Sequence, residues 1–292
     1  MTELPLVSII VPHYNDLQGL DACLTALSNQ EGTALFRYEI VVCDNDSPVG
    51  LAQVRSVVNG RARVFQSKTP GAGPARNAAV RQARGSLLAF TDSDCIPAPR
   101  WLANGIAKVE PNTIVGGQML VSVRDEGNLS GAEAFERVFA FNNKRYVEEE
   151  GFSVTANLFC AKASFLQVGP FRSHVSEDKE WCQRALEMGF TIRYAADAIV
   201  SHPARPNWSS LVKKWERIDL ESFNLSKERS QLSNLKWLAK GWLLPLSIVP
   251  HGVRCLRSDA VSGPRARAKA LMTLARIRLW RFWHYHVLSF AN

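Results

Sequence analysis

Apolar runs alternate with amphipathic stretches through the first 120 residues. Runs rich in branched and aromatic side chains end at polar turns and predict strands at 6–12, 38–44, 62–67 and 87–92. Between the first two runs, leucines recur at steps of 3, 4 and 3 over residues 17–27, the spacing of one helix face. Continuous apolar strands separated by helices predict an α/β fold with a parallel sheet covered by helices on both faces.

Capping residues locate the helices between these strands. Asn15 is the predicted N-cap of the first helix, because a short polar side chain precedes the first leucine of the pattern. Residues 73–85 predict another helix, with Pro74 in its first turn and Gly85 at its carboxyl end.

Residues 113–203 carry a less regular pattern. The predicted elements are a strand at 113–123, one helix at 132–152, mixed short elements at 155–171, a helix at 176–190 and two short strands within 191–203. Ser176 is the predicted N-cap of the helix at 176–190, whose first turn is acidic and which ends at Gly189.

The last third differs from the rest in charge and aromatic content. Residues 201–292 contain 16 Lys and Arg against five Asp and Glu. Six of the eight tryptophans fall in the same segment: Trp208, Trp215, Trp237, Trp242, Trp280 and Trp283. Such a tail predicts an anionic partner, which could be a membrane surface, a nucleic acid or a phosphorylated ligand.

Two stretches of this tail, 237–250 and 266–290, are apolar but interrupted by basic residues or proline. They therefore fit helices that lie in the membrane interface better than helices that span a bilayer. The alternative is a helical appendage that packs on the body or forms a dimer. The tail carries no nucleic-acid recognition motif, so no nucleic acid is expected as a partner.

The cysteines and the amino terminus bear on location. Six cysteines are scattered without a CxxC pair, which favours reduced thiols over a disulfide framework or a zinc site. No signal peptide is evident, because the first apolar run is strand-like and stops at Pro12. We expect a cytoplasmic protein that associates peripherally with the cytoplasmic face of the inner membrane through its tail.

Polar residues gather where the predicted strands end. Residues 12–15 close the first strand, 44–47 follow the second and 91–94 follow the fourth. The carboxyl ends of parallel strands share one edge of a sheet, and ligands bind beyond that edge. The sequence therefore predicts one crevice lined by these turns.

Asp92 and Asp94, separated by Ser93, suggest a metal site in that crevice. Two carboxylates at a strand end can offer oxygens to Mg²⁺ or Mn²⁺, which complete their shells with phosphate oxygens and water. The alternative is a solvated turn, because Asp-Ser-Asp is ordinary turn composition.

Three further features could serve the same crevice. The turn at 71–73 precedes Arg76, whose planar guanidinium suits a phosphate or a base edge. Glu177 and Asp178 either complement the dipole of their helix or supply a general base. His202, at the end of an apolar strand, is either a structural residue or a metal ligand.

In order and spacing, segments covering about the first 205 residues resemble glycosyltransferase family 2, the inverting enzymes of the GT-A fold, and in particular bacterial exopolysaccharide-type sugar transferases. The matching segments are VSIIVPHYN (7–15), EIVVCDNDS (39–47), GAGPARNAAVRQARG (71–85), LLAFTDSDCIPAPRWL (87–102), TANLFCAKASFLQVGPF (155–171), SEDKEWCQRALEMGFTI (176–192) and AIVSHP (198–203). The resemblance implies a Rossmann-like nucleotide-diphospho-sugar transferase with a mixed, mainly parallel sheet and a helical C-terminal extension.

The resemblance also implies a nucleotide site at the first two strand ends. Pro12, Tyr14 and Asn15 match the family's Pro-x-Tyr-Asn turn, which holds the nucleotide. Asp44 matches the aspartate that ends the second strand and shares this role. Arg76 matches a helix arginine near the base and phosphates.

A metal site for Mn²⁺ or Mg²⁺ is implied next to it. Asp92 and Asp94 match the family's DXD pair, with Asp92 nearer the ribose and also close to the metal, and Asp94 on the metal. Ser93 lies between them in the donor site. His202 matches a histidine that completes the metal site in many members.

The remaining implied residues handle the sugars. Ala156 and Asn157 match the segment that lines the donor sugar. Asp178 matches the catalytic base of the Glu-Asp motif, with Glu177 beside it. One base suffices for inversion, because the acceptor hydroxyl attacks from the face opposite the diphosphate.

The implied activity is that of a metal-dependent hexosyltransferase. It would move one sugar from a nucleotide-diphosphate donor, UDP favoured, to a hydroxyl of a saccharide or polyprenyl-linked oligosaccharide acceptor in polysaccharide biosynthesis. Processive synthases of the family carry a Gln-x-x-Arg-Trp motif, whereas the nearest stretch here is LVKKWER (211–217). A single transfer is therefore favoured. Lys214 or Arg217 could contact the diphosphate, but a solvated helix face is the favoured interpretation of both.

The expected organisation is a catalytic domain at 1–205 followed by a basic, membrane-associating region at 206–292. Within the catalytic domain, residues 1–120 would bind the nucleotide sugar, and 121–205 would supply the acceptor side and the base. Two alternatives stay open. One is a catalytically degenerate module that binds sugar nucleotides and docks at a membrane. The other is a nucleotidyltransferase, whose Gly-rich Arg-Pro loop after the first strand is absent here.

Overall fold

The computed structural model describes residues 4–229 and 232–290. The chain forms two compact units. The first comprises Met1–Leu120, Asn142–Ser173 and Glu177–His202, and the second comprises Val121–Phe141, His174–Ser176 and Pro203–Asn292. Residues 121–141 thus group with the C-terminal helices. The predicted division of functions between 1–205 and 206–292 stays a prediction.

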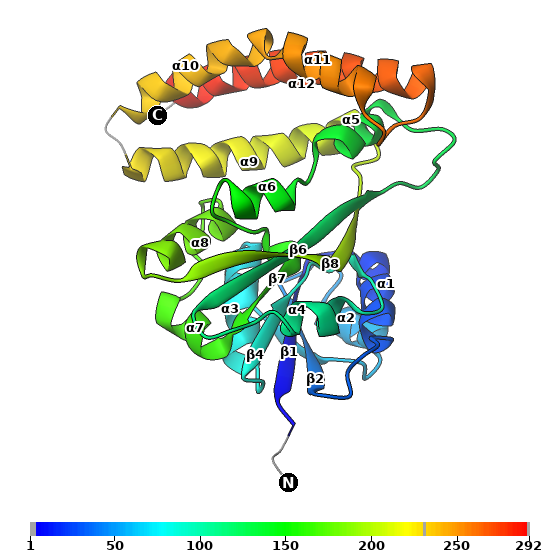
Figure 1. Ribbon diagram of the computed structural model, residues 1–292, viewed down its shortest axis with the longest axis vertical. Coiled ribbons are helices and arrows are strands. Elements are labelled where there is room, and N and C mark those ends of the chain that lie inside the picture. Colours follow the sequence, from blue (N-terminus) through cyan, green and yellow to red (C-terminus); the bar gives the residue numbers. More distant parts are fainter. Residues whose placement is uncertain (1–3, 230–231, 291–292) are drawn as a thin grey trace. The chain divides into compact units, whose positions relative to one another are not determined.

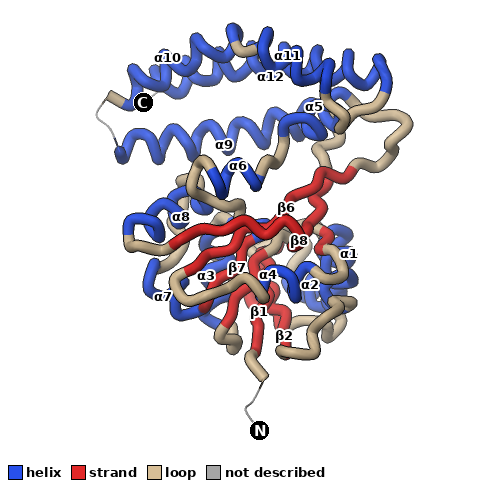
Figure 2. Tube along the Cα trace, in the orientation of Figure 1, coloured by secondary structure: helices blue, strands red, loops and turns tan. Residues whose placement is uncertain are grey.

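The first unit is built on one eight-stranded sheet (Figure 2). Its strands are β1 (Leu6–His13), β2 (Arg37–Asp44), β3 (Arg63–Gln66), β4 (Leu87–Phe90), β5 (Ile96–Pro97), β6 (Thr113–Ser122), β7 (Leu158–Ala161) and β8 (Thr191–Pro203). Their order is β3-β2-β1-β4-β7-β6-β8-β5. The first four are parallel, whereas β7 runs antiparallel to β4 and β6, and β5 antiparallel to β8. The predicted α/β fold with a mixed sheet is confirmed.

Helices cover both faces of this sheet in the first unit (Figure 1). They are α1 (Leu17–Ser28), α2 (Leu51–Val58), α3 (Ala72–Gln82), α4 (Trp101–Ile106), α6 (Asn143–Glu148), α7 (Lys162–Val168) and α8 (Glu177–Glu187), with a 3₁₀ turn, η1 (Thr155–Asn157). Phe90, Phe165 and Trp181 join strand and helix side chains in one buried cluster. Because both faces are covered, the central strands are apolar throughout, as their sequence predicts.

Two predicted helix boundaries differ in the structure. Asp16, not Asn15, caps α1, because its carboxylate accepts a hydrogen bond from Gly19 N at 2.9 Å. Asn15 instead adopts a left-handed backbone with φ of 53°. Gly85 lies beyond the end of α3, and its role is close packing, since a Cβ there would lie 2.5 Å from Leu6 O.

Two predicted elements in the middle third were also wrong. The single helix expected at 132–152 is divided into α5 (Gly131–Phe139) and α6, because Ala140 leaves the helical conformation and Asn142 accepts a hydrogen bond from Arg145 N that starts a new helix. Residues 191–203 form one strand, β8, and not two. The two adjacent exposed residues at 196–197 interrupt its alternation without a turn.

The second unit is helical. Besides α5 it contains α9 (Trp208–Arg229), α10 (Ser233–Leu246), α11 (Ile248–Arg257) and α12 (Gly263–Phe290). Phe135, Leu211 and Leu274 lie in one buried cluster, and Trp237 stacks on Tyr285 at 4.3 Å in another. Across the residues that the structure describes, no helix combines the length and apolarity needed to cross a membrane.

Lys214 departs from its expected position on a solvated helix face. Its side chain is largely buried and forms an ion pair with Glu136 Oε1 at 2.5 Å. The ammonium also lies over the Phe141 ring at 5.3 Å. Burial lowers the pKa of Lys214, although the Glu136 charge opposes that shift. Lys214 is therefore a packing residue of the second unit.

Candidate active site

The ends of β1 and β2 form the first part of the site. Their parallel register places His13 beside Asp44, and His13 Nδ1 lies 2.8 Å from Asp44 Oδ1. Ser47 donates to the same carboxylate from its backbone N–H at 3.0 Å and from its hydroxyl. Asp44 is fully buried, so its side chain is already committed to His13 and Ser47. The sequence reasoning assigned no individual role to His13 or Ser47; the strand register places His13 beside Asp44, and Ser47 bonds to Asp44 from three residues further along the chain.

The turn after β1 is more open. Pro12 is buried in the strand, whereas the Tyr14 side chain is 61% exposed and available for stacking. Asn15 is exposed, and its backbone N–H donates to Ser47 Oγ at 2.8 Å. Of the residues expected at the nucleotide, Tyr14 and Asn15 are thus the accessible ones, and Asp44 shapes the turn beneath them.

Arg76 links two elements that are distant in sequence. The guanidinium is 3% exposed and donates to Asp92 Oδ1 at 2.5 Å, just beyond β4, and to Glu177 Oε1 at 2.8 Å, at the start of α8. Burial lowers the pKa of Arg76, but the charges and hydrogen bonds of Asp92 and Glu177 raise it by a larger amount. The guanidinium therefore stays protonated. The structure therefore brings together Arg76, Asp92 and Glu177.

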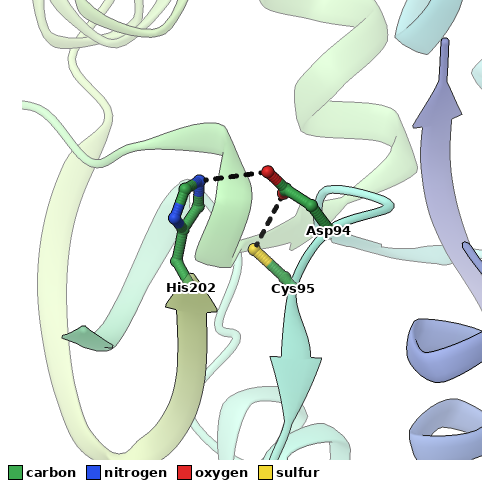
Figure 3. A group of neighbouring side chains, drawn as sticks. All are labelled: Asp94, Cys95 and His202. Carbon is green, nitrogen blue, oxygen red and sulfur yellow. Dashed lines mark hydrogen bonds and ion pairs between the residues drawn. The ribbon is translucent and has the colours of Figure 1, made fainter. Parts of the chain in front are cut away.

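A second group forms around Asp94 (Figure 3). In the antiparallel pair of β5 and β8, Ile96 lies opposite Ser201, and this register brings the residues before β5 close to His202. His202 Nε2 lies 3.4 Å from Asp94 Oδ2, and Cys95 Sγ lies 3.8 Å from Asp94 Oδ1. Ligand atoms of these three residues all lie within 4.8 Å of one another.

The donor set of this group fits a divalent cation such as Mn²⁺. A carboxylate and a neutral imidazole are ligands that Mn²⁺ accepts. Burial, followed by the charges of Asp92 and Asp94, raises the pKa of the Cys95 thiol well above its ordinary value. Thiolate is a soft ligand that suits Mn²⁺ less well than a carboxylate or an imidazole does, so Asp94 and His202 are the candidate ligands. Two protein ligands leave positions for phosphate oxygens and water.

Ser93 and Ala156 are buried, and Asn157 is fully buried. Asn157 Oδ1 accepts from Trp101 Nε1 at 2.9 Å, and its Nδ2 donates to the carbonyls of Gln118 and Ala198. Gly117 makes room for this arrangement, because a Cβ there would lie 2.4 Å from the Asn157 amide. The Asn157 side chain thus bonds to both β6 and β8. The role of Ala156 and Asn157 in lining the donor sugar stays a prediction.

Asp178 follows Glu177 in the first turn of α8 and is partly exposed. Its Oδ1 accepts from the backbone N–H of Lys179 at 2.7 Å. Burial raises the pKa of nearby Tyr146, and the Asp178 charge adds to that shift. The Asp178 carboxylate thus lies, partly exposed, in the first turn of α8, and the neighbouring Glu177 carboxylate pairs with Arg76.

Comparisons with known proteins fit this geometry. Residues 8–167 match the family described as Glycosyl transferase family 2, and residues 89–286 match Glycosyl transferase family group 2. Glycosyltransferase AglE of Haloferax volcanii is 30% identical over 288 residues, which cover 96% of this chain and 93% of that protein. The chain belongs to glycosyltransferase family 2. These matches also fit the resemblance to bacterial exopolysaccharide-type transferases.

Two further relatives extend the comparison. The Escherichia coli UDP-Glc:alpha-D-GlcNAc-diphosphoundecaprenol beta-1,3-glucosyltransferase WfgD is 35% identical over 101 residues, covering 34% of this chain and 37% of that protein. The mannosyltransferase PcManGT of Pyrobaculum calidifontis, solved with GDP-Man and Mn²⁺, superposes with a TM-score of 0.57 at 17% identity, covering 99% of this chain and 85% of that one. This structural similarity assigns the GT-A fold to the family 2 chain.

Proposed function

We propose that this family 2 glycosyltransferase transfers a single hexose, with inversion, from a nucleotide-diphosphate donor to an acceptor hydroxyl. The observation that carries the proposal is the grouping of Asp94 with His202 beside the Arg76–Asp92–Glu177 cluster, all within the first unit. A metal-ligand pair and a buried cation next to each other are suited to a diphosphate.

The donor end is assigned to the turns beyond β1, β2 and β4. Tyr14 offers a ring for the base and Asn15 offers polar groups at the same turn, while Asp44 fixes the turn through Ser47. Asp94 and His202 would hold Mn²⁺ or Mg²⁺, with Asp92 adjoining. Bound there, the ion would offset the charge on the donor diphosphate as it leaves.

The acceptor end is assigned to Asp178. Its partly exposed carboxylate would accept the proton of the acceptor hydroxyl. The hydroxyl oxygen then forms a bond to the anomeric carbon while the bond from that carbon to the diphosphate oxygen breaks, and the nucleotide diphosphate departs. Glu177 is proposed as a positioning residue, because its ion pair with Arg76 fixes the start of α8.

The substrates are proposed from the relatives. The name of WfgD specifies UDP-Glc and a diphosphoundecaprenol-linked acceptor, and PcManGT binds GDP-Man. We favour a UDP-sugar donor and a lipid-linked saccharide acceptor in polysaccharide biosynthesis at the cytoplasmic face of the membrane. LVKKWER (211–217) lacks the processive motif and Lys214 is buried, which supports a single transfer.

A donor screen tests this function. Purified protein is incubated with UDP- and GDP-sugars, Mn²⁺ or Mg²⁺ and a membrane extract, and released nucleotide is measured. Release that depends on metal and extract, with a product of inverted anomeric configuration by NMR, is expected. Nucleotide binding without release would favour a degenerate module, and release of pyrophosphate from a sugar phosphate and a nucleoside triphosphate would favour a nucleotidyltransferase.

A further inference from the structure

Exposed large apolar side chains form two rows on the C-terminal helices. The α10–α11 row consists of Leu235, Trp242, Leu246, Val249, Val253 and Leu256. The α12 row consists of Met272, Leu279, Trp283, Val287 and Phe290. Members of both rows recur at steps of three, four and seven residues, so each row occupies one side of its helices. Trp242 and Trp283 are 63% and 69% exposed. Such contiguous apolar exposure marks an interaction surface.

The two rows are neighbours within the second unit. The Trp242 ring lies edge-on to the Phe282 ring of α12, with centroids 4.9 Å apart. Figure 1 shows α10 and α11 lying along α12. The opposite sides of these helices carry the core, where Trp237 and Tyr285 are buried with Phe223 of α9. The core of these helices is therefore formed by other side chains, and the two rows do not contribute to it.

The charge of the same helices indicates which kind of partner binds the two rows. Residues 232–290 contain one acidic residue, Asp259. Ten residues there are basic, and nine of them are at least partly exposed: Lys236, Lys240, Arg254, Arg257, Arg265, Arg267, Lys269, Arg276 and Arg278. The tenth, Arg281, is buried and pairs with Asp219. A second copy of the chain would bring like charges against each other, which is unfavourable. A bilayer with anionic headgroups supplies both an apolar phase for the rows and negative charge for the surrounding Lys and Arg.

We propose that the two rows insert into the headgroup region of a bilayer that contains anionic lipids. Tryptophan suits this depth, because its ring is apolar and its N–H stays near water. Long basic side chains beside the rows reach the phosphates while their stems cover apolar surface. The surface rests on the proposed function only in that a lipid-linked acceptor would lie in the same bilayer.

Vesicle binding tests the surface. The full chain is mixed with vesicles of phosphatidylcholine and phosphatidylglycerol at about 3:1, so that the bilayer is anionic. Co-sedimentation and a blue shift of tryptophan fluorescence are expected, both weakened by high salt. Trp242→Ser combined with Trp283→Ser is expected to lower vesicle binding by about tenfold or more, because two rings lose their apolar burial.

Matched control variants distinguish binding through the two rows from nonspecific binding by exposed apolar side chains. Leu35→Ser combined with Leu166→Ser removes two leucines of the first unit that are 79% and 64% exposed, and should leave vesicle binding unchanged. A charge variant, Arg257→Glu with Arg265→Glu, should weaken binding to anionic vesicles while keeping the apolar rows intact. Circular dichroism of each variant checks folding.

Several results would overturn the proposal. They are vesicle binding by the double Trp variant equal to that of the wild-type chain, binding that is independent of phosphatidylglycerol, and a dimer in light scattering that the Trp variant dissociates. Metal-dependent nucleotide binding is measured in the same samples. If nucleotide binding persists and vesicle binding is absent, only the proposed membrane surface is refuted. If vesicle binding is present and nucleotide binding is absent, only the proposed function is refuted.

Discussion

A buried arginine is paired with carboxylate in each unit, and the two arrangements differ. Arg281 directs Nε and one terminal nitrogen at both oxygens of Asp219, at 3.0 and 2.6 Å, and also donates to Tyr285 Oη. Arg76 divides its terminal nitrogens between Asp92 and Glu177. Its Nε has no hydrogen-bond partner among the described residues.

The difference separates a fixed contact from one that a ligand can rearrange. Arg281 also lies 3.8 Å from the Trp215 ring, so its bidentate pair is enclosed by aromatic side chains. The carboxylates of Asp92 and Glu177 are 30% and 15% exposed and come from separate elements. Water can therefore replace part of either contact when a diphosphate approaches. Similar burial of one residue type thus accompanies a packing contact in the second unit and, in our proposal, a contact with the donor diphosphate in the first.

The largest expected effect separates Asp178 from its neighbour Glu177. Asp178→Asn should lower kcat by roughly 10³ to 10⁴, because the general base is lost while nucleotide binding is kept. Glu177→Gln should cost only about tenfold, because Arg76 still holds Asp92. Nucleotide release under saturating substrates measures both, with Glu187→Gln on the same helix as control. Equal losses for the two variants would remove the distinction between base and positioning residue.

The next effect is on stability. Arg281→Met should lower the free energy of unfolding by about 3–5 kcal/mol, because Asp219 stays buried without its partner. The double variant Arg281→Met, Asp219→Leu should recover most of that loss. Urea unfolding followed by tryptophan fluorescence measures both. If the double variant does not recover stability, the loss in Arg281→Met does not come from the unpaired charge of Asp219, and the explanation is wrong.

Substitution of Arg76 should affect activity more than stability, the reverse of what is expected for Arg281. Arg76→Met is expected to lower kcat/KM by about 10², because a preorganised cation is lost beside the diphosphate. The melting temperature should change far less than in Arg281→Met, because the two freed carboxylates are partly exposed. Arg81→Met, on the exposed side of α3, is the control. A large loss of stability with unchanged turnover would place Arg76 in the same class as Arg281.

The pair of Arg63 and Glu39, whose side chains are 30% and 14% exposed, should show the smallest effect. Burial raises the pKa of Glu39, but hydrogen bonds from Arg84 N, Ser8 and Arg63 lower it by more. Ionised Glu39 therefore stabilises the fold above its ordinary pKa, and this contribution is lost as the pH falls through the lowered value. Glu39→Gln should cost about 0.5–1 kcal/mol at neutral pH, and progressively less as the pH falls below about 4. Thermal unfolding at neutral pH and at a series of lower pH values checks this, and a constant difference would contradict the assigned shift.

Local patterns were sufficient to predict β1 to β4 and several helices of the first unit. An apolar run bounded by polar turns determines a buried strand almost without tertiary context, as in β1. Asn142 shows the limit: one side-chain hydrogen bond to Arg145 N starts a new helix within a stretch whose periodicity is continuous. β8 shows another, because pairing overrides a local break in alternation.

The candidate site was predictable in its membership but not in its connections. Strand-end reasoning and the family resemblance identified Arg76, Asp92 and Glu177 separately. Their ion pairs join residues that are 16 and 101 positions apart, and no local period encodes such a contact. The contact of His13 with Asp44 follows from the register of β1 and β2, which the sequence does not specify residue by residue.

The metal–diphosphate site is the central claim, and nucleotide binding to the wild-type chain and to Asp94→Asn tests it most directly. Calorimetric titration with UDP or GDP is carried out with and without Mn²⁺. Asp197→Asn is the control, because Asp197 lies on β8 with His202 but pairs with Lys108 at 3.2 Å. Wild type and Asp197→Asn should bind nucleotide in a Mn²⁺-dependent manner, and Asp94→Asn should lose at least about tenfold in affinity. Mn²⁺-dependent affinity that is the same in all three would contradict the assignment.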